Sequence, residues 1–188
     1  DAMQTHPLTL SRALIVLFAA AILLSGCGPV RPDSEDLANQ ANTARQLESA
    51  GDYATAAKQW RAIAASAAGK ERDSAMLSAA SNAYRAGQVK QARADLASIP
   101  VPAAPDRASE YLLLRAELAI ADNDARDALE ALELLPAEAS TATRIQALEL
   151  QADAYLLVGQ AGPAVVALEQ RGSLLESPAA VEENQRQI

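Results

Sequence analysis

The sequence predicts an all-α protein, more specifically an α-solenoid of stacked helical hairpins. Alanine accounts for 45 of the 188 residues, and aromatic residues make up only 3%. Alanine is the strongest helix former, whereas aromatic and β-branched residues favour strands, so both observations favour helices over sheets. A third observation, an internal period of 36 residues, is typical of a repeat protein.

Four turn residues set the period: Gly51, Gly87, Asn123 and Gly159 follow one another at intervals of 36. Glycine and asparagine tolerate a positive φ, so each can end a helix and reverse the chain. Alanine stands seven residues before and five residues after every turn residue, and a bulky apolar residue stands nine after it. The predicted repeat core comprises Ala56, Trp60, Ala92, Leu96, Ala128, Leu132, Ala164 and Leu168.

This spacing predicts how the hairpins pack. The small residues let the two helices of a hairpin approach closely, and the bulky residues fill the groove against the next hairpin. A single hairpin cannot bury such a stripe alone, so we expect four of them to stack. An apolar residue also recurs twelve after the first three turn residues, until Arg171 breaks the series. The alternative is an alanine-rich bundle without a true repeat.

Local signals predict eight helices and part of a ninth. Asp106 is the expected N-cap of the fifth helix, Pro136 should stop the sixth, and Pro163 should lie in the first turn of the eighth. A ninth helix should begin after Ser177-Pro178, and no stop signal precedes Ile188, so we expect the natural protein to continue. The eight expected helices cover 34–49, 53–68, 71–86, 89–98, 108–121, 125–135, 142–158 and 161–170.

The N-terminal stretch is typical of an export signal. An apolar run of twelve residues, 13–24, would span only about 18 Å as a helix, too little for a bilayer core of roughly 30 Å. It ends in Leu24-Ser25-Gly26-Cys27, which resembles a bacterial lipobox. That resemblance implies acylation of Cys27 and, because Gly28 rather than aspartate follows, delivery to the outer membrane of a Gram-negative cell. We therefore expect a signal peptide with its lipobox in 1–27, a tether in 28–33 and the helical domain in 34–188.

The repeat resembles the tetratricopeptide repeat over residues 34–172. Ala50-Gly51-Asp52-Tyr53 is similar to its turn, and Leu148 and Tyr155 fit its first helix, although the period is 36 rather than 34. The resemblance implies a right-handed solenoid whose first helices line a concave groove. The register then selects candidate residues for binding a protein segment, of which Leu77, Leu113 and Ile120 could instead be core. The candidates are Arg45, Leu77, Ser81, Tyr84, Leu113, Ile120 and Leu156.

The C-terminal residues suggest a more specific resemblance than the tetratricopeptide repeat alone. Arg171 followed by Leu174-Leu175, and then Asn184 four before Ile188, is similar to the LpoA/LppC family of outer-membrane lipoproteins that activate class A penicillin-binding proteins. The resemblance implies that this chain is the lipidated N-terminal domain of such an activator. Its partner would be a peptidoglycan synthase, contacted through a larger C-terminal domain that this sequence does not include.

The residue inventory argues against catalysis, metals and cofactors. The one histidine, His6, and the one cysteine, Cys27, both lie in the expected signal peptide, which leaves no Ser/His or Cys/His pair and no zinc site. The stretch 122–127 lacks two residues that the calcium-loop pattern requires, an oxygen ligand at Arg126 and a glycine at Asp127. Glu130 and Glu133 are expected to lie on a solvent-exposed helix face. The net charge of −8 argues against nucleic-acid binding. A lipoprotein of an outer-membrane assembly or secretion machine is the alternative function, and a carboxylate-based peptidoglycan hydrolase is the least favoured one.

Overall fold

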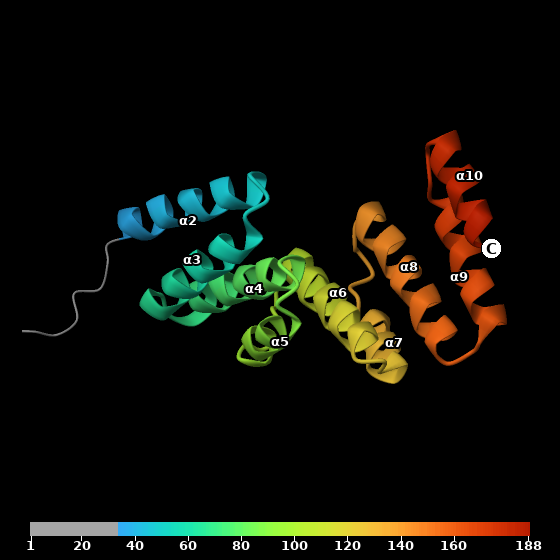
Figure 1. Cartoon of the computed structure of the whole chain (residues 1–188), viewed down its shortest axis with the longest axis horizontal. Helices are drawn as coiled ribbons and strands as arrows, with labels where there is room; N and C mark the ends of the chain where they lie inside the picture. The colour runs from blue at the N-terminus through green and yellow to red at the C-terminus, as the bar shows by residue number, and fades with distance from the viewer. Residues whose placement is uncertain (1–33) are drawn as a thin grey trace, which may run out of the picture.

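The computed structural model describes residues 34–188, and this part of the chain is all-α, with no strand. The helices follow one another in chain order along an elongated molecule (Figure 1). Their bounds are α2 Ser34–Ser49, α3 Tyr53–Ser66, α4 Gly69–Arg85, α5 Val89–Ala97, α6 Pro105–Ala121, α7 Ala125–Glu133, α8 Thr141–Leu157, α9 Ala161–Ser173 and α10 Pro178–Gln187. None of these helices is long and apolar enough to cross a membrane. The predictions made for Cys27, for the signal peptide 1–27 and for the tether 28–33 lie outside the described residues.

The four predicted turn residues all adopt a positive φ. Gly51, Gly87, Asn123 and Gly159 have φ values of 78°, 72°, 59° and 71°. After each of them, the N–H of the next residue donates to the carbonyl five residues earlier, at 2.8–2.9 Å, which is the bond of a left-handed helix cap. These bonds join Asp52 to Leu47, Gln88 to Ala83, Asp124 to Ala119 and Gln160 to Tyr155. The 36-residue period in the sequence therefore corresponds to one turn geometry made four times.

The positions that recur around these turns are buried. The alanines five residues after the turn residue and seven residues before it are no more than 2% exposed, and the bulky residues nine after it are no more than 9% exposed. Twelve after the turn, Ile63 and Ile99 are buried and Leu135 is half-buried. The predicted repeat core is therefore confirmed as core. The buried members are Ala44, Ala56, Trp60, Ala80, Ala92, Leu96, Ala116, Ala128, Leu132, Ala152, Ala164 and Leu168.

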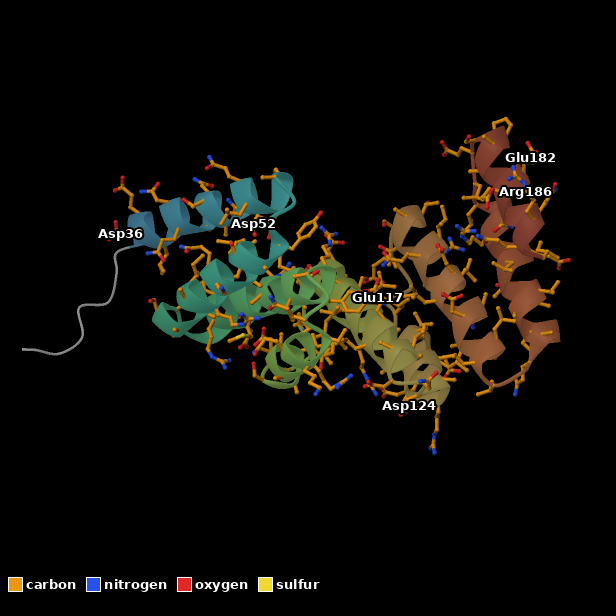
Figure 2. The ribbon with its side chains drawn as sticks, viewed as in Figure 1. Asp36, Asp52, Glu117, Asp124, Glu182 and Arg186 are labelled. Carbon is orange, nitrogen blue, oxygen red and sulfur yellow. The ribbon has the colours of Figure 1, made fainter. Side chains whose placement is uncertain are left out.

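Buried side chains form four successive clusters rather than one centre. The first joins α2, α3 and α4 around Trp60, and the second joins α3 to α6 around Leu77. The third joins α6, α7 and α8 around Leu112, and the fourth joins α8 and α9 around Leu168. Each helix packs chiefly on its neighbours in sequence, while α4 also contacts α6 and α6 contacts α8. In Figure 2, Asp52 at the turn after α2 lies in the left half of the molecule, and Asp124 at the turn after α6 lies on its lower side.

One predicted helix start is wrong. We expected a helix from 108 capped by Asp106, but α6 begins at Pro105, and the extended Ala104 precedes it. A proline favours the first helical position because its ring presets φ and its missing N–H is not needed there. The predicted end of α9, at 170, is also three residues from the observed one, and the remaining predicted ends lie within two residues of the observed ones. Pro163 lies in the first turn of α9, as predicted.

Helix α10 is joined to α9 by polar groups. Asn184 is only 2% exposed, and its Nδ2 donates to the Leu168 carbonyl at 2.8 Å. Arg171 donates to Asn184 Oδ1 at 2.8 Å, to Gln187 at 3.1 Å and to Glu149 at 3.3 Å. A Cβ atom at Gly172 would lie 2.8 Å from Asn184 Nδ2, so glycine allows this close approach. Arg171 stands twelve residues after Gly159, a position that is apolar in the other three hairpins, and its hydrogen bonds hold α10 against α9.

Candidate functional site

A groove of about 910 Å³ opens on the described part of the chain. It lies along the first helices of the first two hairpins, α2 and α4, and is completed by α3 and the start of α6. Arg45 and Ser81, both predicted to face a groove, line it. They are joined there by side chains that the sequence analysis did not select. These are Glu48, Asn82, Arg85, Arg107 and Glu110.

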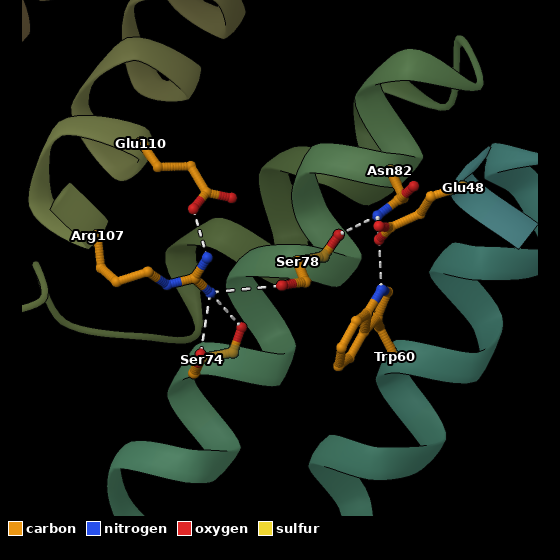
Figure 3. Close-up of polar contacts among 7 residues, drawn as sticks. All are labelled: Glu48, Trp60, Ser74, Ser78, Asn82, Arg107 and Glu110. Carbon is orange, nitrogen blue, oxygen red and sulfur yellow. Dashed lines mark hydrogen bonds and ion pairs between the residues drawn. The ribbon is translucent and has the colours of Figure 1, made fainter. Parts of the chain in front are cut away.

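A carboxylate ties the first two hairpins together at the base of the groove (Figure 3). Glu48 Oε1 accepts a hydrogen bond from Trp60 Nε1 at 2.6 Å and another from Asn82 Nδ2 at 2.7 Å. Asn82 Nδ2 also donates to the Ser78 carbonyl at 2.8 Å. Because hydrogen bonds to a charged group are the stronger kind, this arrangement fixes α2, α3 and α4 relative to one another. Trp60 is 8% exposed and acts as a core residue.

An arginine closes the other side of the groove (Figure 3). Arg107, near the start of α6, forms an ion pair with Glu110. Its Nη2 donates to the Ser74 carbonyl at 2.6 Å and to the Ser74 hydroxyl at 3.0 Å on α4. The charges of Arg107 and Glu110 are therefore neutralised within the fold, and their geometry serves to join the second and third hairpins.

Two further arginines on the groove are differently placed. The Arg45 guanidinium carbon lies 5.9 Å from the centre of the Trp60 ring, and that of Arg85 lies 5.5 Å from the centre of the Tyr53 ring. A cation over an aromatic face is attracted by the electron-rich ring. Both side chains are exposed, and neither forms an ion pair with any carboxylate of residues 34–188. Arg45 Nη1 donates a hydrogen bond to Asn42 Oδ1 at 2.6 Å, and the charge of Arg85 acts on the carboxyl group of Glu117.

The other predicted groove residues lie elsewhere. Leu77 is fully buried and Leu113 is 8% exposed, so both are core residues, which was the alternative left open for them, and neither lines a groove. The position ten residues before the turn residue faces the neighbouring helices, and both leucines belong to core clusters. Tyr84 and Ile120 are half-buried against the same clusters, which fits the alternative that Ile120 is core. Leu156 is 55% exposed, at the end of α8 and away from the groove residues.

A second electrostatic feature lies between the second, third and fourth hairpins. Glu117 on α6 is half-buried, and its Oε1 accepts a hydrogen bond from Gln146 of α8 at 2.9 Å. Burial raises the pKa of Glu117 and outweighs the opposing effects of the Gln146 hydrogen bond and the Arg85 charge. Burial and the charge of Glu117 together raise the pKa of Tyr84. On α8, burial and the charge of Glu149 raise the pKa of Asp153.

The pKa of Glu117 predicts a pH-dependent stability. The folded pKa lies above its ordinary value of 4.5, so the folded state binds more protons than the unfolded state just above that pH. The free energy of unfolding therefore contains a favourable contribution at lower pH that is lost as the pH rises through the folded pKa. We expect Glu117→Gln to be more stable than the native chain at pH 7, and the difference to vanish below about pH 4. Urea unfolding followed by circular dichroism at both pH values measures this.

Glu133→Gln is the matched control for that prediction. Glu133 is an exposed carboxylate on α7, so its replacement removes the same charge without relieving any burial. It should leave the free energy of unfolding nearly unchanged at both pH values. A Glu117→Gln chain that is less stable than the native chain at pH 7 would show that the Gln146 hydrogen bond dominates.

The groove is lined by charged and hydrogen-bonding side chains together with apolar ones. Residues 34–188 contain neither histidine nor cysteine. Among the described residues, no three aspartate or glutamate side chains come together as a metal-binding group. Glu48 and Glu110 are held by neighbouring donors, Asn82 is buried, and the exposed polar groups of the groove include the guanidinium groups of Arg45 and Arg85. These groups can form hydrogen bonds and ion pairs with a polar ligand.

Neither a family model nor a curated protein nor a solved structure matches this chain.

Proposed function

We propose that residues 34–188 form a right-handed α-solenoid of four tetratricopeptide-like hairpins followed by α10. In this proposal they are the non-catalytic arm of an outer-membrane lipoprotein that helps to activate a class A penicillin-binding protein. The observation that carries the architecture is the capping bond made in the same way after Gly51, Gly87, Asn123 and Gly159. Hairpins that share one turn geometry and have small buried residues at the same positions can stack with a constant relative orientation, as the units of repeat proteins do.

The proposed mechanism is tethering. Acyl chains on Cys27 would hold the protein at the inner face of the outer membrane, and several chains anchor stably where one does not. Four hairpins and a final helix, at about 10 Å per layer, would give an arm of roughly 40–50 Å. An arm of this kind raises the local concentration of a synthase partner and favours its active state by binding that state more tightly.

The proposal is tested first by lipidation and location. We expect the protein, made with its own leader in a Gram-negative host, to incorporate an alkynyl palmitate analogue and to fractionate with the outer membrane. The Cys27→Ser variant should lose both properties, because only a thiol forms the thioether to the lipid. Equal labelling of the two proteins would contradict the lipoprotein assignment.

A second experiment tests activation of the synthase. Removing residues 34–172 from the protein that carries them should lower synthase-dependent glycan synthesis in cells and leave copurification of the synthase intact. Unchanged glycan synthesis would contradict the role of the helices in activation. Loss of copurification between purified components would place the synthase contact on the helices and contradict the tethering mechanism.

A lipoprotein of an outer-membrane assembly or secretion machine is the second candidate function. One observation favours it: the groove along α2 and α4 is open and polar, and it carries two arginines without an ion pair. A groove of this kind suits capture of a protein segment. In that role the helices would contact the partner directly, which is the outcome that the copurification experiment distinguishes.

A further inference from the structure

Helix α10 is attached to the rest of the molecule in a different way from the other helices. Within residues 34–188, every helix from α2 to α9 contributes buried side chains to the four apolar clusters, whereas α10 contributes none. The one buried side chain of α10 is that of Asn184, which is polar. Because burial of apolar surface is the main favourable term in helix packing, α10 gains little from it.

Polar contacts take the place of apolar packing between α9 and α10. Asn184 Nδ2 donates to the Leu168 carbonyl at 2.8 Å. Arg171 Nη1 donates to Asn184 Oδ1 at 2.8 Å and to Gln187 Oε1 at 3.1 Å. We call these three hydrogen bonds the α10 clasp. The positions 36 and 72 residues before Asn184 carry leucine, so the clasp stands where two other hairpins have an apolar side chain.

Arg171 has other partners when the clasp is open. Its Nη2 already donates to Glu149 of α8 at 3.3 Å. Burial and the charge of Glu149 raise the pKa of Asp153, and the charge of Arg171 opposes this rise, so Arg171 lies near both acids. Water can solvate Asn184 once α10 has left. Opening therefore leaves neither the guanidinium group nor the amide buried without a partner, which keeps its cost low.

The connection between α9 and α10 can serve as the pivot. Glu176 and Ser177 are exposed, and the Ser177 side chain makes no capping bond to α10. Pro178, at the start of α10, has no N–H that would need a partner.

We propose that α10 is a strap that opens and closes as one unit about residues 174–177, while α2 to α9 stay folded. The clasp holds the strap closed, and opening uncovers the face of α9 that α10 covers. A helix of ten residues is not stable alone in water, so α10 loses its helical hydrogen bonds when it is released.

The helix at the other end of the described chain provides a comparison. In α2, Ala44 is fully buried in the first cluster, and Glu48 accepts hydrogen bonds from Trp60 of α3 and Asn82 of α4. Both apolar and polar contacts therefore hold α2. We expect the second half of α2 to stay closed under conditions in which α10 opens.

Amide hydrogen exchange of the whole protein, followed residue by residue by NMR, tests the proposal. After correction for intrinsic rates, the amides of residues 182–187 should exchange at one shared rate. That rate should be at least about a hundredfold faster than the rates of residues 164–168 in α9 and 44–48 in α2. Low concentrations of urea should hardly change it, because release of α10 exposes little surface compared with global unfolding.

Variants locate the clasp. Arg171→Leu removes the donor to Asn184 and should raise the shared exchange rate of α10 at least about tenfold. Adding Asn184→Leu should slow exchange again, because two leucines can pack together where the other hairpins have an apolar residue. Arg186→Leu is the matched control, since Arg186 is 63% exposed and pairs with exposed glutamates of α10 itself. It should leave the rate within about twofold. Slow exchange in α4 and α6 shows that each variant remains folded.

Three outcomes would overturn the inference. If α10 exchanges with the rate and the urea dependence of α8 and α9, it opens only when the whole molecule unfolds. If the rates rise steadily from residue 182 to residue 187, the helix frays from its end and does not open as a unit. If Arg171→Leu and Arg186→Leu have equal effects, the clasp does not hold the strap. The inference does not depend on the activator role, since exchange is measured on the protein without a partner.

Discussion

Leu77→Ala is expected to lower the free energy of unfolding by about 3–5 kcal/mol, the largest effect of any single change proposed here. Leu77 is fully buried, and it packs in the cluster that joins α3, α4, α5 and α6. Truncation removes its contacts with that cluster and leaves a cavity that surrounding helices fill only in part. Urea denaturation followed by circular dichroism at 222 nm measures the change.

Leu156→Ala is the matched control, since it makes the same chemical change two hairpins later in the chain. Leu156 is 55% exposed, so its truncation should change the free energy of unfolding by no more than about 0.5 kcal/mol. The pair also separates two interpretations of the sequence, because both leucines were candidates for a binding groove. Similar effects of the two truncations would contradict the burial that distinguishes them.

The second large effect is expected at the contact between α9 and α10. Arg171→Leu removes the donor to Asn184 Oδ1 and leaves that buried amide oxygen unpaired, which should cost about 2–3 kcal/mol. The double variant, Arg171→Leu with Asn184→Leu, should lose less than the sum of the two single variants by at least about 1 kcal/mol. The reason is that the positions 36 and 72 residues before Asn184 are Leu148 and Leu112, so an apolar residue suits this place in a hairpin.

A double-mutant cycle measures this coupling from four denaturation curves. The control is Arg186→Leu, which removes an arginine of α10 that is 63% exposed and pairs only with exposed glutamates. It should change stability by no more than about 0.5 kcal/mol. Strict additivity of the Arg171 and Asn184 effects would show that the two side chains do not act as a pair.

The sequence predicted the helices because the signals that determine them are local. A glycine or asparagine at a positive φ needs no distant partner to end a helix, and Gly51, Gly87, Asn123 and Gly159 all do so. The burial of Ala56 and its equivalents followed from their constant distance to those turns. The start of α6 was missed because Asp106 and Pro105 both favour a helix start, and the preset φ of the proline prevailed over the capping side chain.

The groove was only partly predictable because its members come from three hairpins. Arg45 and Ser81 were selected because each stands six residues before a turn residue. Glu48 stands three residues before Gly51, as the candidates Tyr84, Ile120 and Leu156 do before their own turn residues. Leu77 was misplaced because an offset does not tell whether a leucine faces the groove or the neighbouring helix. Asn82 and Arg107 carry no signal of their own, since their roles depend on partners that only the packing of the helices brings near.

The division of the buried side chains into four clusters has a mechanical consequence. In a globule with one core, a change in packing at one place affects the packing of the whole core. Here each cluster is formed only by helices that are near one another in the sequence. Small displacements at successive junctions can add up along the chain, so the distance between its two ends can change while every hairpin keeps its internal packing.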